Sequence, residues 1–503
     1  YKMRFIFVIW IFILVLSNRI YSKENPNIII IYTDDQGYGD SSLLNSNSKF
    51  QTPNIDRIGK EGITFTDAHS PDTVCTPSRY GLLTGRYSWR TQLKRGVFGA
   101  EHPCLIKNNR LTIASYLQSS GYQTAMVGKW HLGMNFPGTK GNRDWSKPTK
   151  DMPLDKGFDY FWGIPASMNY GVLAWFNGRH PISPPTLFTR KKPNEIAISD
   201  YRIKSPYEVK SKAPDDLEVA KDFEDDKCLT FFTQKAKEWI QSRNKNTPFF
   251  LYLSYTSPHK PVIPLPGFRG KGKAGAYGEF MIETDHHVGE ILETLDKENI
   301  SENTMVIFSS DNGPENTWSE RAKKYNHQSN YTFRGGKRSI YEGGHRVPFF
   351  VRWPIKIKSG QKSNAPICQT DIFATIAEVI DKKIPTQFAE DSNSFFQELT
   401  DQGSKEFRPA IIHHSSSGRF AIREGKWKLV MEGRKKSEKR ELYDLINDPR
   451  EQRNVIKDHP KINSHLTKKI SAIISNGRSS PGPPSQNDTS PWNDLVWMKD
   501  NNN

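Results

Sequence analysis

The residues best suited to chemistry lie in the stretch Cys75-Thr76-Pro77-Ser78-Arg79, which runs on to Thr84-Gly85-Arg86. A break at Ser70-Pro71-Asp72 precedes it, so the pattern predicts a short helix that begins at Cys75. The N-terminus of a helix presents free N–H groups and a partial positive charge, both of which favour an anion. Arg79, one turn later, adds a charged donor within reach of the same anion. The stretch therefore predicts a reactive atom beside an anion cradle, although Cys75 could also be a buried structural thiol.

Polar side chains also follow four predicted strands. The segment 27–35 contains four consecutive isoleucines, which is typical of a strand buried on both faces, and further apolar runs lie at 122–127, 248–255 and 304–309. Open parallel sheets place their functional sites at the C-terminal ends of the strands, so we expect these polar groups to converge. The residues that follow the four strands are Asp34, Asp35, Lys129, His131, His259, Asp311 and Asn312.

Two adjacent carboxylates, Asp34 and Asp35, end the first of these strands. An isolated pair of this kind is commonly a solvated loop, just as His131 alone could be a structural histidine. Burying paired carboxylates is costly, however, unless a cation or hydrogen-bond donors compensate. Because the pattern recurs at four strand ends, we interpret Asp34 and Asp35 as oxygen ligands of a hard cation, Ca²⁺.

The order of elements predicts the fold. Helical patterns at 111–119, 229–241 and 278–296 lie between the strands. Such alternation is typical of an α/β fold, here a large mixed, mostly parallel sheet sandwiched by helices. Short strands expected at 410–414, 419–423, 426–431 and 441–445, with a helix at 460–474, predict a smaller C-terminal antiparallel-sheet subdomain.

The motifs together resemble the signature of the type I sulfatases, which include arylsulfatases and N-acetylgalactosamine-6-sulfatases and share the alkaline phosphatase superfamily fold. The core Cys-x-Pro-Ser-Arg with its Thr-Gly-Arg sequel is the most specific element, and the resemblance extends from about Pro26 to about Asn454. The other matching segments are Asp34 to Asp40, Gly128 to Gly133, Gly163 to Ser167, Asp311 to Gly313 and Gly335 to Gly344.

This resemblance implies a mechanism. Cys75 would be oxidised after synthesis, by a formylglycine-generating enzyme, to formylglycine, whose aldehyde hydrate is the nucleophile. One Ca²⁺ would be held by Asp34, Asp35, Asp311, Asn312 and residue 75. Arg79, Lys129 and Lys337 would neutralise charge on the sulfate group. His259, with help from Lys337, would protonate the leaving alcohol, and His131 would remove the proton whose loss releases sulfate.

The same resemblance implies a sulfate-binding residue and a reaction. Ser167 would donate to the sulfate. Asn169, which lies near Ser167 in the sequence, could either face the sugar or cap its own loop. The expected reaction is hydrolysis of a sulfate monoester at the end of a sulfated carbohydrate, with a sulfated galactose, N-acetylgalactosamine or glucosamine as the leading candidates. Two alternatives remain at this stage, a phosphate mono- or diester hydrolase of the same superfold and a catalytically silent glycan-binding protein.

Four segments are expected along the chain. Lys2 and Arg4 precede an apolar run at 5–16, a pattern that predicts a secretory signal over 1–22 rather than an uncleaved membrane anchor. The protein should then be exported, to the periplasm or exterior of a bacterium or to the secretory pathway or lysosome of a eukaryote, with no stable membrane association. The other segments are a catalytic domain at 23–365, a C-terminal subdomain at 366–476 and an extended or disordered tail at 477–503.

Composition indicates the kind of partner. The chain has 71 basic and 55 acidic residues, a net charge of +16, which favours anionic partners such as sulfated glycans. No nucleic-acid-binding motif is present, so nucleic acid is not expected as a partner. Besides Cys75 the chain has Cys104, Cys228 and Cys368, which allow at most one disulfide. Trp162 and Trp175 could pack against a sugar but are better interpreted as core aromatics.

Overall fold

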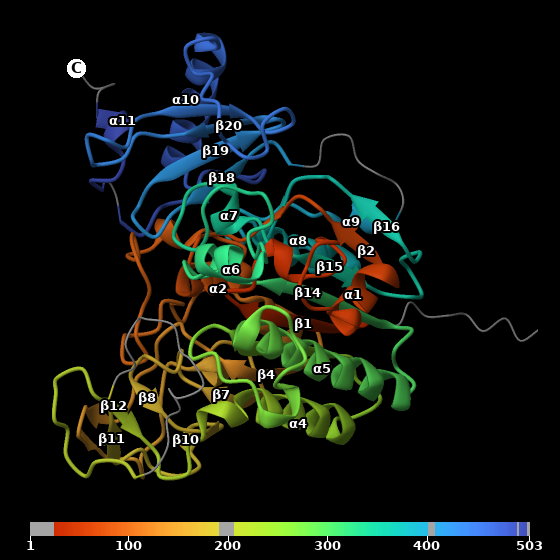
Figure 1. Cartoon of the computed structure of the whole chain (residues 1–503), viewed down its shortest axis with the longest axis vertical. Coiled ribbons are helices and arrows are strands. Elements are labelled where there is room, and N and C mark those ends of the chain that lie inside the picture. The colour runs from red at the N-terminus through yellow and green to blue at the C-terminus, as the bar shows by residue number, and fades with distance from the viewer. Residues whose placement is uncertain (1–24, 191–205, 401–407, 490–491, 500–503) are drawn as a thin grey trace, which may run out of the picture.

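The computed structural model describes residues 25–190, 206–400, 408–489 and 492–499. Within these residues the largest sheet has ten strands and forms the centre of the molecule (Figure 1). In order across the sheet they are β10 (His180–Pro181), β9 (Phe176–Asn177), β7 (Tyr160–Ile164), β4 (Gln123–Lys129), β13 (Phe249–Pro258), β1 (Asn27–Asp34), β14 (Thr304–Ser310), β15 (Phe349–Arg352), β2 (Ile63–Phe65) and β16 (Gln361–Ser363).

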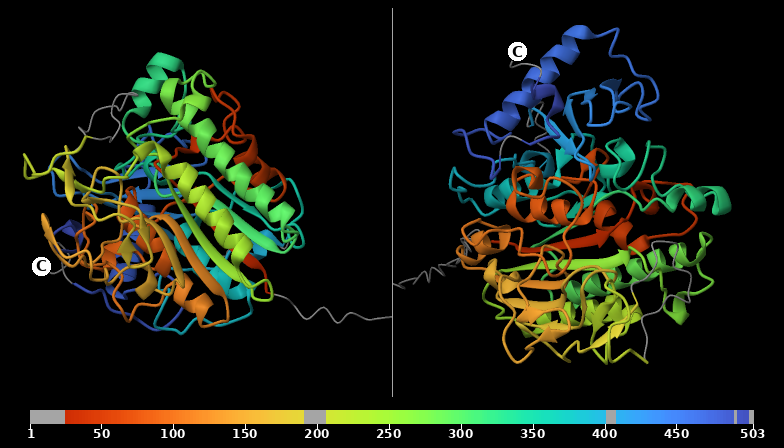
Figure 2. Two further views of the ribbon diagram at one scale, coloured as in Figure 1. Left: turned by 90° about the horizontal axis from the view of Figure 1, so that it is seen from below. Right: turned by 90° about the vertical axis from the view of Figure 1, so that its left-hand side faces the viewer.

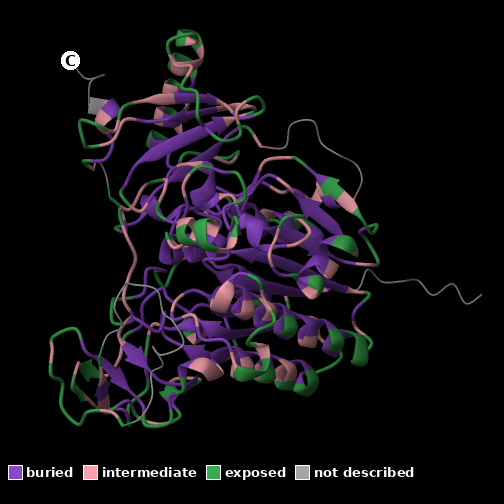
Figure 3. Ribbon diagram, viewed as in Figure 1, coloured by how far each residue is buried: buried purple, intermediate pink, exposed green. Residues whose placement is uncertain are grey.

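The middle of this sheet is parallel. β1 pairs with β13 on one side and β14 on the other, with Ile28 opposite Phe250 and Met305, and β4 lies between β13 and β7. The isoleucines of β1 are fully buried, which explains why the strand lacks polar alternation. Figure 3 shows that the middle of the central sheet is buried, whereas β16 at its edge is partly exposed. β15 pairs antiparallel with β14, so the predicted mixed, mostly parallel sheet is confirmed.

Helices cover both faces of the sheet. α4 and α5 pack against β13, and α1 packs against α5, β14 and β15, whereas α2 packs against α3 and α8. Figure 2 shows α4 and α5 lying side by side across one face. The helices predicted at 111–119, 229–241 and 278–296 are confirmed as α3, α4 and α5, with shifts of a few residues at their ends. The bounds of all the helices named in this paragraph are α1 (Pro53–Lys60), α2 (Cys75–Thr84), α3 (Ile113–Gln118), α4 (Cys228–Ser242), α5 (Gly275–Lys297) and α8 (Ile372–Val379).

A second, smaller core lies in the C-terminal part of the chain. Its four-stranded antiparallel sheet matches the predicted subdomain, and the helix α10 (Pro460–Ser475) packs on it. We call the part of the chain built around the ten-stranded sheet the larger unit and the part built around this four-stranded sheet the smaller unit. The smaller core also contains Tyr87, Trp89 and Cys368, whereas α8 packs in the large core although it lies beyond residue 366. The strands are β18 (Ile411–His414), β19 (Phe420–Glu424), β20 (Trp427–Val430) and β21 (Glu441–Asp444).

The described part of the C-terminal segment differs from the expected extended or disordered tail. Trp497, in the short helix α11 (Val496–Lys499), is 2% exposed and packs in the second core with Leu495. Upstream, the Asp488 carboxylate accepts a hydrogen bond from Arg86 at 3.1 Å. The composition, which is rich in Ser, Pro and Asn, did not predict these contacts. Burial of Trp497 and the hydrogen bond between Arg86 and Asp488 attach the segment to the rest of the protein.

Three other expectations concern the rest of the chain. Trp162 and Trp175 are buried and stack with ring centroids 5.4 Å apart, so they are core aromatics. All four cysteines are buried and free, so none forms a disulfide. The expected signal segment 1–22 lies outside the described residues. No helix among those residues has both the length and the apolar character needed to cross a bilayer.

Candidate active site

Four neighbouring strands bring the expected site residues to one edge of the sheet. Asp34 ends β1 and Lys129 ends β4, while His259 follows β13 and Asp311 follows β14. These strands are adjacent in the order β4, β13, β1, β14 and run parallel, so their C-terminal ends meet. The helix α2, with Cys75 as its first residue, starts above the same edge, where Cys75 Sγ lies 3.5 Å from Asp34 Oδ1.

The Cys75 thiol is only 2% exposed. Burial raises its pKa well above the ordinary value, although Lys129 and Lys337 oppose this effect. The unmodified thiol is therefore protonated at neutral pH, and a protonated thiol is a weak nucleophile. A reaction at residue 75 requires some other chemical form of this side chain.

Each carboxylate of the site pairs with a buried cationic group. Lys129 Nζ lies 2.5 Å from Asp34 Oδ2, and Lys337 Nζ lies 2.6 Å from Asp35 Oδ1. The third pair joins Arg79 NH2 to Asp311 Oδ2 at 2.7 Å. Buried ion pairs of this kind recover the cost of desolvation only with good geometry and further hydrogen bonds.

Burial and the neighbouring charges shift the pKa values of the three carboxyl groups. Burial raises the pKa of Asp35 despite Lys337, and burial together with the charge of Asp34 raises the pKa of Asp311. Burial also opposes ionisation of Asp34, but Lys129 and Arg79 outweigh it and lower the pKa of that carboxyl. Ionisation of Asp35 and Asp311 is therefore unfavourable in this buried site, and a bound cation would favour their charged forms.

The polar atoms available at this edge fit a hard cation. The amide Nδ2 of Asn312 donates to Asp35 Oδ1 at 2.8 Å, while the Oδ1 of Asn312 is buried and has no hydrogen-bond partner. An orphaned amide oxygen among three carboxylates gives an all-oxygen donor set, which is the preference of Ca²⁺. Asp34, Asp35, Asp311 and Asn312 can therefore hold such an ion, beside the side chain of residue 75.

Two histidines approach residue 75 from different loops. His259 Nδ1 lies 2.7 Å from the carbonyl oxygen of Lys260, and its Nε2 lies 3.8 Å from Asp35 Oδ2. Burial lowers the pKa of His259 to about 3. His131 Nε2 lies 2.9 Å from the carbonyl oxygen of Phe98, which leaves its Nδ1 buried without a partner. Burial also lowers the pKa of His131 well below its ordinary value.

Unusual backbone conformations surround these side chains. Asp35, His131 and Arg338 have φ values of 67°, 59° and 75°, in the left-handed region that non-glycine residues rarely adopt. Gly128 has φ 113°, and a Cβ there would lie 2.0 Å from the carbonyl oxygen of Ser254 on the neighbouring strand. Strain of this kind persists where the surrounding structure fixes functional side chains.

A cavity of about 170 Å³ opens above Cys75. Its wall includes the cationic side chains Lys260, Lys337 and Arg338, so it is suited to an anion. Asn169 is in the wall and its Oδ1 is buried without a partner, whereas Ser167, whose Oγ also lacks a partner, is not in the wall. The full lining is Val74, Cys75, Gly96, Val97, His131, Asn169, Tyr170, His259, Lys260, Lys337, Arg338 and Ser416.

Several wall residues were not singled out in the sequence. Lys260 and Arg338 directly follow His259 and Lys337, so adjacency to the motifs was a usable signal. Ser416 belongs to the loop between β18 and β19, and its backbone N donates to Thr73 Oγ1 at 3.1 Å. Nothing local to Ser416 predicts that the C-terminal subdomain reaches the cavity.

Comparisons with known proteins agree with this geometry. A sulfatase family profile matches residues 26–382, and a profile for the C-terminal region of N-sulphoglucosamine sulphohydrolase matches residues 333–476. The chain is 34% identical to an N-acetylgalactosamine-6-O-sulfatase of Bacteroides thetaiotaomicron, covering 90% of this chain and 94% of the relative. It is 30% identical to the N-acetylgalactosamine-6-sulfatase of Mus musculus, covering 81% and 72%.

Solved structures show the same likeness. A protein described for the metabolism of multiple glycosaminoglycans by Bacteroides thetaiotaomicron shares 32% identity with a TM-score of 0.78, covering 89% of this chain and 99% of its own. The PsFucS1 sulfatase from Pseudoalteromonas sp. has a TM-score of 0.69 at 22% identity, covering 90% of each chain, and supports the fold.

The fold is of the α/β class, and its cationic cavity lies at the C-terminal ends of the parallel strands. The chain belongs to the sulfatase family. It is accordingly a sulfuric ester hydrolase.

Proposed function

We propose that this protein removes sulfate from the terminal sugar of a sulfated glycan, with the 6-O-sulfate of N-acetylgalactosamine as the leading substrate. The size and charge of the cavity carry this proposal. A cavity of only about 170 Å³ that is lined by Cys75 and three cationic side chains admits an anionic group on a chain end more readily than the middle of a polymer. Relatives named as N-acetylgalactosamine 6-sulfatases support the choice of sugar.

Residue 75 is the proposed nucleophile after its oxidation to formylglycine by a formylglycine-generating enzyme. The hydrate of that aldehyde supplies a hydroxyl group for attack on sulfur, which the buried, protonated thiol does not. The position of Cys75 at the start of α2, 3.5 Å from a carboxylate oxygen of Asp34, is suited to a polar side chain at this point. The motif around Cys75 supports the same modification.

The proposed Ca²⁺ would be held by Asp34, Asp35, Asp311 and Asn312, together with residue 75. When bound, the ion polarises the sulfate oxygens and lowers the pKa of the attacking hydroxyl. The orphaned Oδ1 of Asn312 and the raised pKa values of Asp35 and Asp311 are what support this assignment.

Three cationic side chains would stabilise the transition state. Lys337 lines the cavity, while Lys129 and Arg79 lie directly behind it against Asp34 and Asp311. Because all three are buried, their charges act with little screening by water on the oxygens of a bound sulfate. Their ion pairs with the carboxylates also fix their orientation before substrate arrives.

Proton transfer would use the two histidines. The hydrogen bond between His259 Nδ1 and the Lys260 carbonyl holds a proton on Nδ1, so Nε2 is the atom that faces the cavity. To act as an acid the ring must carry a second proton, on Nε2, which the negative charge of a bound sulfate ester would favour. Nε2–H would then pass that proton to the departing alcohol oxygen as the bond between that oxygen and sulfur breaks, leaving the neutral ring with its proton on Nδ1. The hydrogen bond of His131 Nε2 to Phe98 leaves Nδ1 free to accept the proton whose loss releases sulfate.

Substrate binding would use Asn169 and Ser167. The unpartnered Oδ1 of Asn169 is in the cavity wall and can accept a hydrogen bond from a sugar hydroxyl. Ser167 Oγ is equally unpartnered but lies outside the wall, so its proposed role as a donor to sulfate requires a small movement of the 165–171 loop.

Export of the protein is a separate proposal, which depends on the apolar run at 5–16.

Sulfate release from a defined panel tests the proposal. Full-length protein made with a formylglycine-generating enzyme would be assayed by ion chromatography on N-acetylgalactosamine 6-sulfate, its 4-sulfate, N-acetylglucosamine 6-sulfate and an aryl sulfate. We expect the first to be the best substrate. Faster turnover of the matched phosphate ester would instead favour the phosphate hydrolase, and glycan binding without turnover would favour the silent binding protein.

A further inference from the structure

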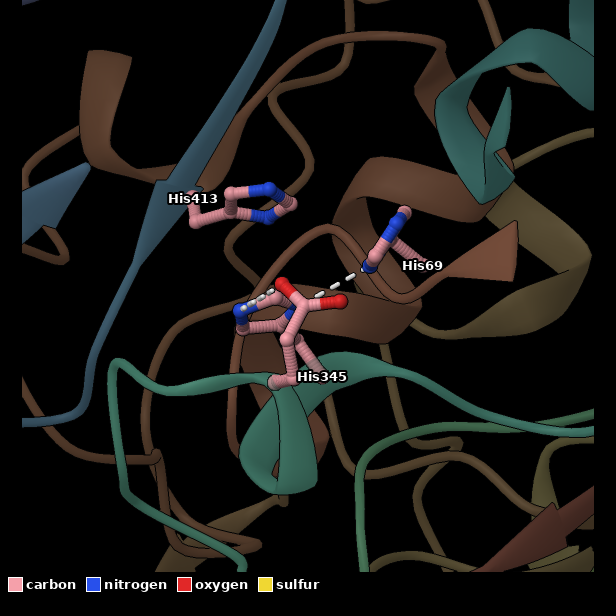
Figure 4. Close-up of side chains that lie close together, drawn as sticks. His69, His345 and His413 are labelled. Atoms are coloured by element: carbon pink, nitrogen blue, oxygen red, sulfur yellow. Dashed lines mark hydrogen bonds and ion pairs between the residues drawn. The ribbon is translucent and has the colours of Figure 1, made fainter. Parts of the chain in front are cut away.

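Four buried side chains form a second cluster that shares no residue with the active site. His69 lies on β3 (Ala68–His69), Glu342 and His345 lie on α7 (Glu342–His345), and His413 lies on β18 of the C-terminal sheet. One ligand atom of each lies within 4.8 Å of the others, and all four side chains are at most 1% exposed. Figure 4 shows the rings of His69, His345 and His413 gathered from these three elements.

We propose that His69, His345, His413 and Glu342 form a structural Zn²⁺ site that joins the two units of the protein. His413 belongs to the smaller sheet, whereas the other three belong to the larger unit. A metal ion held by all four would therefore tie β18 to β3 and α7. This site would be separate from the proposed Ca²⁺ site and would not take part in the reaction.

His413 gives the first reason for a ligand. Its ring stacks on His345 with centroids 3.9 Å apart and an interplanar angle of 13°. Both of its nitrogens are buried and neither has a hydrogen-bond partner. Buried polar atoms are normally satisfied, so an imidazole with two orphaned nitrogens beside two more imidazoles indicates a missing partner.

The contact between His69 and His345 gives a second, independent reason. Their Nδ1 atoms lie 3.0 Å apart. His69 Nε2 lies 2.9 Å from Asp67 Oδ1, and His345 Nε2 lies 3.2 Å from the carbonyl oxygen of Ile340. Arg423 NH1 and Lys428 Nζ also approach these two Nε2 atoms, at 3.2 and 3.0 Å. In the tautomer in which each Nε2–H donates to its oxygen, both facing Nδ1 atoms carry a lone pair that a metal ion could bind. Metal-binding histidines show this arrangement, with the second nitrogen bonded to a carboxylate or a backbone carbonyl.

The surrounding charges are compatible with a cation. Lys428 Nζ lies 3.0 Å from Glu342 Oε1 and 2.8 Å from Glu451 Oε1. Arg423, the other buried cation beside the cluster, donates to Asp67 Oδ1 at 2.6 Å, so both cations face carboxyl groups. Burial opposes ionisation of Glu342, but Lys428 and the neighbouring cationic groups outweigh it and hold the pKa of that carboxyl well below its usual range. Burial lowers the pKa of His69, His345 and His413, so the imidazoles are neutral, as ligands must be.

The donor set selects the kind of metal. Three imidazoles and one carboxylate suit Zn²⁺, and four protein ligands with no open position are typical of structural zinc sites. Ca²⁺ prefers oxygen ligands and would be disfavoured here. Because the cluster is inaccessible to solvent, the metal would be acquired as the two units pack together during folding.

Metal analysis of the whole protein tests the proposal. Wild type, His413→Ala and the control His286→Ala, a substitution of a 56% exposed histidine on α5, would be expressed with zinc and purified in Ca²⁺ without a chelator. We expect about one zinc ion per chain in the wild type and the control, and its loss in His413→Ala. Wild type without zinc, or zinc retained in His413→Ala, would overturn the proposal.

A second measurement on the wild type does not depend on the folding of a variant. X-ray absorption at the zinc edge should show the scattering of several imidazole ligands. A shell of oxygens alone would place the zinc at the carboxylates of the active site and overturn the proposal. In a metal-free cluster, His345 Nε2 would instead accept a hydrogen bond from Lys428, 3.0 Å away, and His345 Nδ1 would donate to His69.

Discussion

The guanidinium of Arg79 lies 2.7 Å from the carboxylate of Asp311, and both side chains are fully buried. This contact joins the second turn of α2 to the residue that follows β14, across 232 residues of sequence. Arg79 NH1 also donates to Ser254 Oγ, so one planar group binds the middle of β13 and the end of β14 at once. The positions of residue 75 and of the proposed calcium ligands therefore depend on each other.

Replacing Arg79 by lysine should disrupt this coupling. A lysine is a single point charge and does not reproduce the fork geometry that serves Asp311 and Ser254 together. We expect Arg79→Lys to lower kcat/KM for the sulfate ester by about 10²- to 10³-fold, as for loss of one preorganised charge at a reaction centre. Sulfate-release kinetics would measure this, with the exposed Arg269→Lys as control. An effect no greater than that of the control would argue against a role for Arg79.

Removal of calcium should affect stability as well as activity. Without the ion, burial and the neighbouring charge of Asp34 oppose ionisation of Asp35 and Asp311, whose pKa values are raised accordingly. At a Ca²⁺ concentration about 100 times the Kd, the bound ion should stabilise the fold by ~2.7 kcal/mol. Thermal unfolding with and without Ca²⁺ would measure the shift, and Asn312→Ala should reduce it. A Tm that is independent of Ca²⁺ would contradict the assignment of the site.

Substitution of Asn169 should affect turnover of a sugar sulfate more than turnover of a simple aryl sulfate. If its free Oδ1 accepts a hydrogen bond from a sugar hydroxyl, Asn169→Ala should lower kcat/KM for the sugar sulfate about five- to tenfold, the value of one hydrogen bond of ~1–1.5 kcal/mol. Turnover of an aryl sulfate, which lacks that hydroxyl, should change little. Kinetics on both substrates would show this, with the exposed Asn177→Ala as control. Equal losses on both substrates would indicate a structural role.

The pair Arg90–Asp391 predicts a pH dependence of stability away from the active site. Arg90 binds both carboxylate oxygens of Asp391 at 2.8 Å in the interior. Burial opposes ionisation of Asp391, but Arg90 outweighs it and lowers the pKa from 3.8. A depressed folded-state pKa gives stability that is present above pH ~4 and is lost as the pH falls through the folded value.

Asp391→Asn should therefore cost about 3–5 kcal/mol at neutral pH, because it leaves a buried arginine charge unpaired. The difference from wild type should shrink as the pH falls below ~4. Urea unfolding across this range would measure it, with the exposed Asp144→Asn as control. A difference that stays constant with pH would show that the charge of Asp391 does not carry the effect.

Local sequence patterns were sufficient for the four parallel strands β4, β13, β1 and β14 and for the residues at their C-terminal ends, but not for the other six strands of the sheet. The isoleucine run of β1 has no polar alternation because both of its faces are covered, and that cause is visible in the sequence. Two of these strands end at Asp34 and Lys129, and the other two are followed directly by His259 and Asp311. Parallel pairing then brings them together without any further information.

Features that depend on distant contacts could not be predicted in this way. Ser416 reaches the cavity only because the smaller sheet packs near the loop at Thr73. Trp497 is buried by a core formed from strands more than fifty residues earlier in the chain. His69, His345 and His413 have no regular spacing, and only the packing of the two units brings their rings together.

Mass spectrometry of the peptide that contains residue 75 tests the central claim most directly. The sample should be a preparation that hydrolyses a sulfate ester, made in a host with the modifying enzyme. The account predicts the mass of formylglycine at this position. Only unmodified cysteine in a preparation that releases sulfate would contradict the proposed nucleophile.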